Sequence, residues 1–229
     1  MSIQRALVIG GTSGVGRATA DALTASGTRV VATGSERDAT DPGQVAALLD
    51  EADPDVVVVA AGVRPDMAAI DEQTWESFSQ PWNVDVKIAF EVGRAVLARP
   101  LRRGSTVVIM SSGAGVNVNG SPRSGGYAGA KRMQIFLAHY LQQAADARDL
   151  GIRFVALAPL QLLVGTAIGE AAAAAYAPEV GESAEEYISH WPIPLDPAGV
   201  ARAILDVAAG EQHRDATALG VTGEGLGEI

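Results

Sequence analysis

Short apolar runs that fit buried strands alternate along the chain with longer segments of helical periodicity. The strand-like runs cover residues 3–9, 28–33, 56–60, 106–110, 152–157 and 216–221. Helical periodicity covers about residues 14–26, 41–52, 74–97, 127–148 and 196–209. This alternation predicts an α/β fold in which helices cover both faces of a doubly wound parallel sheet. No repeat or linker interrupts it, so we expect one domain over residues 1–229.

Two segments depart from the regular alternation. Pro81 lies inside the helical stretch 74–97 and predicts a bend or a restart there. Residues 160–196 contain an alanine run and several prolines but no strand pattern. Because a long segment of weak periodicity often forms a lid or a substrate loop, we expect about residues 160–196 to form the substrate loop.

A glycine-rich turn connects the first strand to the first helix. Gly10 permits a tight turn, Gly14 allows close approach of a ligand to the backbone, and Gly16 lets the helix pack near the strand. The N–H groups at the start of the helix then face a pyrophosphate. The same composition would suit a plain loop, but its position between a strand and a helix favours a phosphate-binding site.

The end of the second strand is the place where a dinucleotide fold reads the adenosine ribose. Ser35 and Arg37 suit a ribose 2′-phosphate there, whereas Glu36 between them suits a free 2′-hydroxyl. A polar turn without a ligand would look the same. The pattern favours NADP over NAD by a small margin.

Candidate chemistry lies between residues 111 and 131. Tyr127 and Lys131 are four residues apart, so on a helix they share one face. An ammonium beside a phenol favours the phenolate, and such a tyrosine can donate or accept a proton. Ser112, at the end of the preceding strand, could hydrogen-bond the same carbonyl or alcohol oxygen. Taken alone, this pair is more often a solvated helix face, so the interpretation depends on the rest of the chain.

Composition and charge exclude several classes of partner. The 229 residues carry a formal net charge of -10, which disfavours nucleic acid and anionic membrane surfaces. With no cysteine there is no disulfide and no thiolate nucleophile or metal ligand, and we expect no metal site. The N-terminal residues do not form a signal peptide, and no apolar run approaches the roughly 20 residues of a membrane helix. We therefore expect a cytoplasmic protein.

Together these features resemble the short-chain dehydrogenase/reductase family, and the resemblance spans nearly the whole chain. The family's TGxxxGxG motif matches residues 9–16, with Ile9 in place of its threonine. Its NNAG motif matches residues 59–62, where both asparagines are missing. The catalytic tetrad of the family matches, in chain order, Asn83, Ser112, Tyr127 and Lys131.

The resemblance implies a Rossmann-type fold that binds a nicotinamide dinucleotide. An acidic residue that contacts adenine in the family matches Asp38, and a threonine that contacts the nicotinamide carboxamide matches Thr166. The expected cofactor-binding residues are Gly10, Thr12, Ser13, Gly14, Val15, Gly16, Ser35, Arg37, Asp38, Ala60, Ala61, Gly62, Tyr127, Lys131, Pro159 and Thr166.

The activity implied is hydride transfer between a nicotinamide and a carbon that bears oxygen, with an NADPH-dependent ketoreductase favoured. In this interpretation Tyr127 moves the proton, Lys131 assists it and holds the nicotinamide ribose, and Ser112 steadies the substrate oxygen. Asn83 would position a water, although an exposed helical asparagine fits that segment equally well. The family also implies a homodimer or homotetramer. The alternatives are a dehydratase or epimerase, and a non-catalytic dinucleotide sensor or scaffold.

Overall fold

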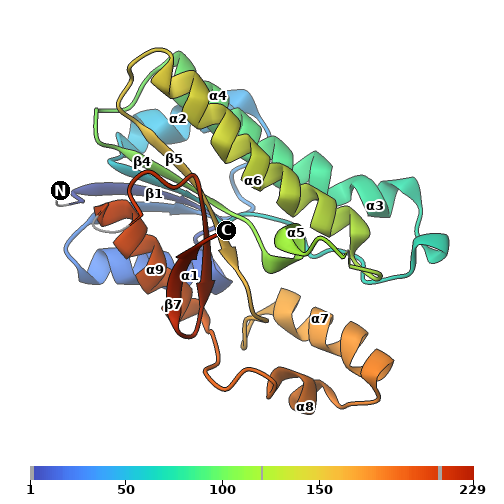
Figure 1. Cartoon of the computed structure of the whole chain (residues 1–229). Helices are drawn as coiled ribbons and strands as arrows, with labels where there is room; N and C mark the ends of the chain where they lie inside the picture. The colour runs from blue at the N-terminus through green and yellow to red at the C-terminus, as the bar shows by residue number, and fades with distance from the viewer. Residues whose placement is uncertain (1–2, 120, 211–212) are drawn as a thin grey trace.

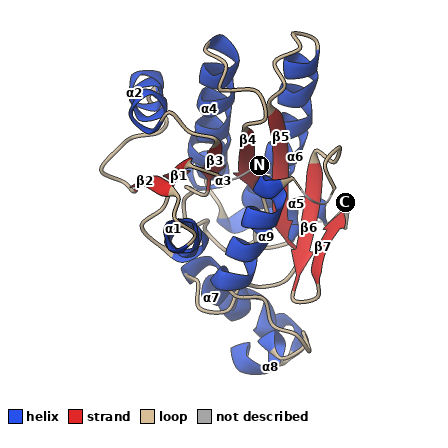
Figure 2. Ribbon diagram, turned by 90° about the vertical axis from the view of Figure 1, so that its left-hand side faces the viewer, coloured by secondary structure: helices blue, strands red, loops and turns tan. Residues whose placement is uncertain are grey.

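One sheet of seven strands runs through the middle of this computed structural model, which describes residues 3–119, 121–210 and 213–229. The strand order is β2-β1-β3-β4-β5-β6-β7, with β2 and β7 at the two edges (Figure 2). Neighbours are parallel except for β6 and β7. The bounds are β1 Arg5–Ile9, β2 Arg29–Thr33, β3 Val56–Val59, β4 Thr106–Met110, β5 Arg153–Pro159, β6 Ala218–Thr222 and β7 Gly225–Glu228.

Helices cover both faces of the sheet, which explains why its central strands are apolar on both sides. In Figure 1, α2 (Pro42–Ala52), α4 (Lys87–Ala98) and α6 (Gly125–Asp146) lie on one face, and α1 (Gly14–Ala25) and α9 (Pro197–Ala209) lie on the other. Each face encloses its own apolar core. The fold class predicted from the periodicity is confirmed.

Local chemistry fixes several helix starts where the sequence predicts them. The Asp41 carboxylate accepts a hydrogen bond of 2.9 Å from Gln44 N, and Pro42 is the first residue of α2. In the same way, the Asp196 carboxylate accepts one of 2.7 Å from Gly199 N, and α9 begins at Pro197. Both predicted starts are confirmed.

Two features differ from the expectations. Residues 160–196 are not an irregular loop, because they contain α7 (Ala167–Tyr176), the 3₁₀ turn η3 (Ala177–Val180) and α8 (Ala184–Ile188). Alanine has the highest helix propensity, so the alanine run forms α7 without an amphipathic pattern. Short elements that the periodicity misses are η1 (Ile70–Glu72), α5 (Gly113–Val116) and the edge strand β7. The bend or restart predicted at Pro81 is confirmed, because the stretch 74–97 divides into α3 (Trp75–Pro81), a π-helical turn η2 (Trp82–Val86) and α4.

The strand order creates a crevice at one end of the sheet. Because β1 lies between β2 and β3, the connections that leave β1 and β3 run in opposite directions. Ligands of such sheets bind outside the carboxyl ends of the strands at this switch point. In the described ranges, no helix combines the length and the apolar character needed to cross a membrane.

Candidate active site

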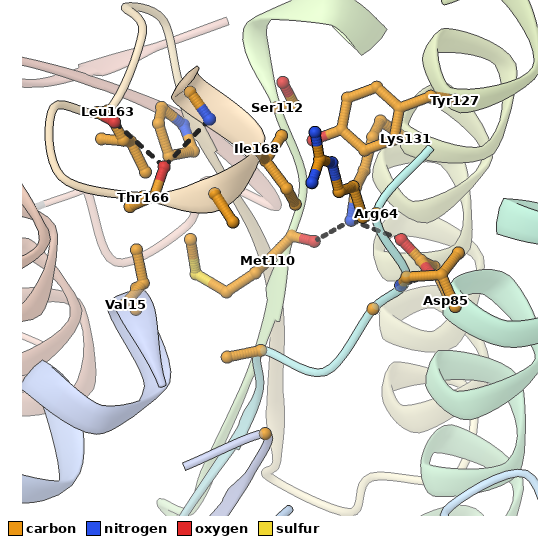
Figure 3. A pocket seen from close by; sticks show the side chains of 18 of the residues that line it. Val15, Arg64, Asp85, Met110, Ser112, Tyr127, Lys131, Leu163, Thr166 and Ile168 are labelled. Carbon is orange, nitrogen blue, oxygen red and sulfur yellow. Dashed lines mark hydrogen bonds and ion pairs between the residues drawn. The ribbon is translucent and has the colours of Figure 1, made fainter. Parts of the chain in front are cut away.

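A cavity of about 1400 Å³ opens at the carboxyl ends of the strands. This volume exceeds the roughly 300–1,000 Å³ of an ordinary small-ligand pocket, so it has room for a dinucleotide and a substrate together. Its walls come from the turns after β1, β2 and β3, from the end of β4, from α6, and from the segment that follows β5. Figure 3 shows part of this lining.

The glycine turn after β1 is fixed by packing that only glycine permits. Gly10 has a φ of +85°, and a Cβ there would lie 2.4 Å from Ala61 N. A Cβ on Gly16 would lie 2.0 Å from Gly10 O. The N–H groups of Gly10 and Gly11 both donate 2.8 Å bonds to Thr33 O, which ties the turn to β2.

The start of α1 fits a diphosphate group. Ser13 is the N-cap residue, but its side chain makes no capping hydrogen bond to the helix. Gly14 has a φ of +50°, and a Cβ there would meet nothing within 4 Å, so the backbone is open at this point of the cavity lining. The first N–H groups of a helix and its dipole bind phosphate in this arrangement.

The three polar residues after β2 take different directions. Ser35 and Arg37 line the cavity. The Glu36 carboxylate instead accepts hydrogen bonds from Gly34 N at 2.7 Å and from Thr33 Oγ1 at 2.9 Å. The bond from the Gly34 N–H lowers the pKa of Glu36 most strongly, so its charge stabilises the end of the strand. Next to it, the Asp38 carboxylate accepts bonds from Thr40 Oγ1 at 2.7 Å and from Thr40 N at 2.9 Å, and the hydroxyl bond is the first cause that lowers the pKa of Asp38.

Ser112, Tyr127 and Lys131 meet at the far end of the cavity from Val15 (Figure 3). Ser112 follows β4 and is the N-cap of α5, where its Oγ accepts a 3.2 Å bond from Ala114 N. Tyr127 and Lys131 lie one turn apart on α6, and the Lys131 Nζ is 5.4 Å from the centroid of the Tyr127 ring. The predicted shared face of these two residues is confirmed, and it is a buried face.

Lys131 is held by a buried carboxylate. Its Nζ lies 3.1 Å from Asp85 Oδ2 and donates a 3.3 Å bond to Met110 O. Burial is the largest single influence and lowers the pKa of Lys131, but the attractions of Asp85 and Tyr127 together outweigh it, so the pKa is raised. The ammonium is therefore charged although the side chain is almost completely buried.

The placement expected for Asn83 is wrong. Asn83 is exposed, does not line the cavity, and donates a 3.2 Å bond to Ser79 Oγ. The π-helical turn η2 changes the helical phase after Pro81, and this change brings Asp85 to the cavity. The Oδ1 atom of Asp85 accepts a 2.9 Å bond from Val63 N, so the carboxylate also anchors the loop after β3.

The other expected residues all lie in the cavity lining. They are Gly10, Thr12, Ser13, Gly14, Val15, Gly16, Ser35, Arg37, Asp38, Ala60, Ala61, Gly62, Ser112, Tyr127, Lys131, Pro159 and Thr166. Thr166 also caps α7, since its Oγ1 accepts a 3.0 Å bond from Gly169 N and donates one of 2.9 Å to Leu163 O (Figure 3). Asp85 and Arg64 are the charged lining residues that the sequence analysis missed. The one available signal for Asp85 is an acidic residue between the apolar residues Val84 and Val86 of a helical stretch.

Comparisons with known proteins agree with this geometry. A family model described as enoyl-(acyl carrier protein) reductase matches residues 35–209, which is more than half of the chain. A comparison with curated proteins finds no match.

Similar solved structures share the fold at low sequence identity. A levodione reductase is 23% identical with a TM-score of 0.77, and the match covers 96% of each chain. A short-chain dehydrogenase from Burkholderia cenocepacia J2315 in complex with NADP is 22% identical with a TM-score of 0.76, over 96% of each chain. A sorbitol-6-phosphate 2-dehydrogenase from Erwinia amylovora is 22% identical with a TM-score of 0.79, over 95% of this chain and 98% of that one.

Proposed function

Because the chain belongs to the short-chain dehydrogenase/reductase family of NAD(P)-dependent oxidoreductases, we propose that it reduces a carbonyl group to a secondary alcohol with NADPH. The observation that carries this proposal is the meeting of Ser112, Tyr127 and Lys131 in one cavity with the glycine turn. One domain performs the whole reaction, since the cofactor-binding turn after β1 and Tyr127 on α6 line the same cavity.

The reduction needs a hydride and a proton. When bound, the nicotinamide supplies the hydride. Tyr127 Oη gives its proton to the carbonyl oxygen, and Ser112 Oγ donates a hydrogen bond to the same oxygen. The Lys131 ammonium, next to the Tyr127 ring, stabilises the negative charge that the phenol acquires. In the oxidative direction, the phenolate takes the proton back from the alcohol.

Asp85, rather than Asn83, reaches the cavity from η2 and lies beside Lys131. It does not contact the reacting atoms, so it is a positioning residue that acts through Lys131. Its carboxylate keeps the ammonium charged and, together with Met110 O, fixes the direction in which the ammonium points. The orientation of Lys131 therefore does not depend on solvent.

The preference for NADPH rests on the turn after β2. Ser35 and Arg37 line the cavity where the ribose 2′-position would lie, and both groups suit a phosphate. The Glu36 carboxylate, which would favour a 2′-hydroxyl, is engaged with Thr33 and Gly34 instead. This arrangement supports the small margin that the sequence gives to NADP.

The proposal includes a cytoplasmic homodimer or homotetramer. Three aromatic side chains on the outer surfaces of α4 and α6 support such an assembly, namely Phe90, Phe136 and Tyr140. They are 47%, 58% and 58% exposed, and the rings of Phe136 and Tyr140 stack with their centroids 6.3 Å apart. An apolar surface of this kind is typical of an interface between copies.

The Tyr127→Phe variant tests the reaction. It removes the proton donor but keeps the ring, so turnover of NADPH with a panel of ketones and aldehydes is expected to fall about 10²- to 10⁴-fold. Binding of NADPH, followed by its fluorescence, should stay close to that of the wild-type protein. A variant with wild-type turnover would refute the assignment of Tyr127. A wild-type protein that binds NADPH but reduces no member of the panel would favour a dinucleotide sensor.

A further inference from the structure

The charged groups of the cavity differ in whether another side chain neutralises them. Lys131 is paired with Asp85, and the Arg37 guanidinium lies 3.2 Å from the Glu51 carboxylate. Asp38 is satisfied by the N–H and hydroxyl of Thr40. Arg64 also lines the cavity, yet no described residue forms a hydrogen bond or an ion pair with its guanidinium.

The backbone holds Arg64 at a defined position. Its neighbour Val63 donates a 2.9 Å bond from N to the buried Asp85 carboxylate, and Pro65 on the other side is buried. The same Asp85 carboxylate contacts Lys131. The backbone next to Arg64 is therefore linked through Asp85 to the Tyr127–Lys131 pair. Figure 3 shows the Arg64 side chain extending from the loop after β3 on the side of the cavity that holds Tyr127 and Lys131, away from Val15 at the start of α1.

We propose that Arg64 binds a carboxylate on the substrate, so that the preferred substrates are small carbonyl compounds bearing a carboxylate group. This inference rests on the proposed reductase function and names the substrate class of the same site. A guanidinium presents a planar pair of donors that matches a carboxylate, and a cation without a protein partner is free to bind one. The pyrophosphate site at α1 lies elsewhere in the cavity (Figure 3), so Arg64 is not the group that binds the pyrophosphate.

The rest of the substrate wall suits one anionic group on a mostly apolar molecule. Leu163, Ile168 and Ala172 line the cavity from the segment after β5, and Tyr187 and Trp191 line it from α8 and the residues beyond. Lys131 carries no surplus charge, because Asp85 neutralises it. One unpaired guanidinium therefore favours a singly charged carboxylate over a phosphate dianion.

Matched pairs of an acid and its methyl ester test this inference. The pairs are 4-oxopentanoate with methyl 4-oxopentanoate, and 4-acetylbenzoate with methyl 4-acetylbenzoate. The variants are Arg64→Gln, Arg64→Lys as a rescue that keeps the charge, and Arg148→Gln as a control that removes an exposed arginine outside the cavity lining. We expect Arg64→Gln to lower kcat/KM for the acids on the order of 10- to 100-fold and to leave the esters unchanged. Arg64→Lys should recover part of the loss, and Arg148→Gln should behave as wild type.

A binding measurement separates this inference from the proposed reaction. 4-Acetylbenzoate and its ester are titrated into the protein saturated with NADP⁺, which cannot reduce them, and the fluorescence of the protein's tryptophans, including Trp191 in the lining, reports binding. Tighter binding of the acid that disappears in Arg64→Gln supports the carboxylate site, even if no ketone is turned over and the reductase proposal fails. Equal binding of acid and ester by the wild-type protein overturns it, as does an acid preference that survives in Arg64→Gln.

Discussion

Asp55 at the amino-terminal end of β3 and Asp85 beside its carboxyl-terminal end are both buried carboxylates that face a cation. The Oδ2 atom of Asp55 accepts 2.9 Å bonds from Gln4 N and Arg5 N. Its Oδ1 atom accepts two bonds from the Arg102 guanidinium, at 2.7 and 3.2 Å. Both oxygens of this carboxylate are satisfied within the protein.

Asp85 is less completely satisfied. Its Oδ1 accepts a bond from Val63 N, and among the described residues the one side-chain partner of its Oδ2 is Lys131, whose Nζ lies 3.1 Å away. Asp85 and Lys131 also line the cavity, whereas Asp55 does not. A partly satisfied buried charge beside a cavity is typical of a functional site.

We infer that Asp55 serves the stability of the fold and that Asp85 serves the chemistry of the cavity. At the amino end, Asp55 joins the starts of β1 and β3 to the residues before β4, so its contacts cross the sheet. At the carboxyl end, the cations face a cavity and have fewer partners. Variants at the first end should therefore change the free energy of unfolding, and variants at the second should change turnover or ligand affinity.

Asp55→Asn has the largest expected effect. An amide cannot accept hydrogen bonds on both of its polar atoms, so at least one donor among Gln4 N, Arg5 N and Arg102 loses its acceptor. We expect the free energy of unfolding to fall by about 3 kcal/mol, measured by urea denaturation at fixed protein concentration. At temperatures where both proteins are folded, kcat should not change. A large loss of kcat with intact stability would contradict the structural role of Asp55.

The pH dependence of this loss has a defined sign. Burial opposes ionisation of Asp55, but the bonds from Arg102 and from the backbone of Arg5 outweigh it, so its pKa is lowered. A carboxyl group with a lowered pKa stabilises the fold above its unfolded pKa of about 3.9, and the contribution is lost as the pH falls through the folded value. The difference between wild type and Asp55→Asn should therefore shrink below about pH 4.

Asp85→Asn should act mainly on turnover. The amide can still accept the bond from Val63 N, so the loop stays anchored, but Lys131 loses its counter-charge. We expect kcat to fall on the order of 10- to 100-fold because the ammonium is no longer held in one direction. Binding of NADPH should change far less than kcat, and a drop confined to KM would contradict a positioning role through Lys131.

A pH profile shows whether Asp85 acts through Lys131. The pKa of Lys131 is raised because the attractions of Asp85 and Tyr127 together outweigh burial. A raised pKa keeps the lysine charged until the pH rises through the folded value, above its ordinary value of about 10.4. Without the carboxylate, burial meets less opposition, so the pKa of Lys131 should be lower than in the wild type. Activity of Asp85→Asn should therefore decline at a lower alkaline pH than that of the wild type. An identical alkaline limb in both proteins would separate Asp85 from Lys131.

Most of the fold and of the cavity lining could be predicted because they depend on local patterns. Fully apolar strands such as Val56–Val59 indicate a covered parallel sheet, and the caps Asp41 and Asp196 mark helix starts within one turn. The glycine turn is equally local, since the conformation of Gly10 and the packing of Gly16 exclude a side chain. Each of these signals lies within a few residues of the feature it predicts.

The missed residues depend on geometry that the sequence does not express. The π-helical turn after Pro81 shifts the helical phase, so that Asp85 is buried at the cavity and Asn83 is exposed to solvent. An uninterrupted α-helix would not give Asp85 this position. The Glu36 carboxylate points toward the hydrogen-bond donors of Thr33 and Gly34 rather than toward a ribose. The sequence alone does not show which of these partners the carboxylate binds. Arg64 belongs to no recognisable sequence motif, and only the cavity lining places it near Tyr127 and Lys131 (Figure 3).

Arg37→Gln has the smallest expected effect of these variants. It tests whether Arg37, a further cation at the carboxyl ends of the strands, reads the ribose 2′-phosphate. Arg37 is half-exposed and partly neutralised by Glu51, so its loss should weaken NADPH binding only about tenfold and leave NADH binding unchanged. Arg29→Gln is the matched control, because it removes the same charge from the opposite end of β2. Fluorescence titration with both nucleotides gives the ratio of the two affinities. If Arg37→Gln weakens both nucleotides equally, Arg37 does not read the 2′-phosphate, and the exposed cations at this end of the sheet only attract anions in general.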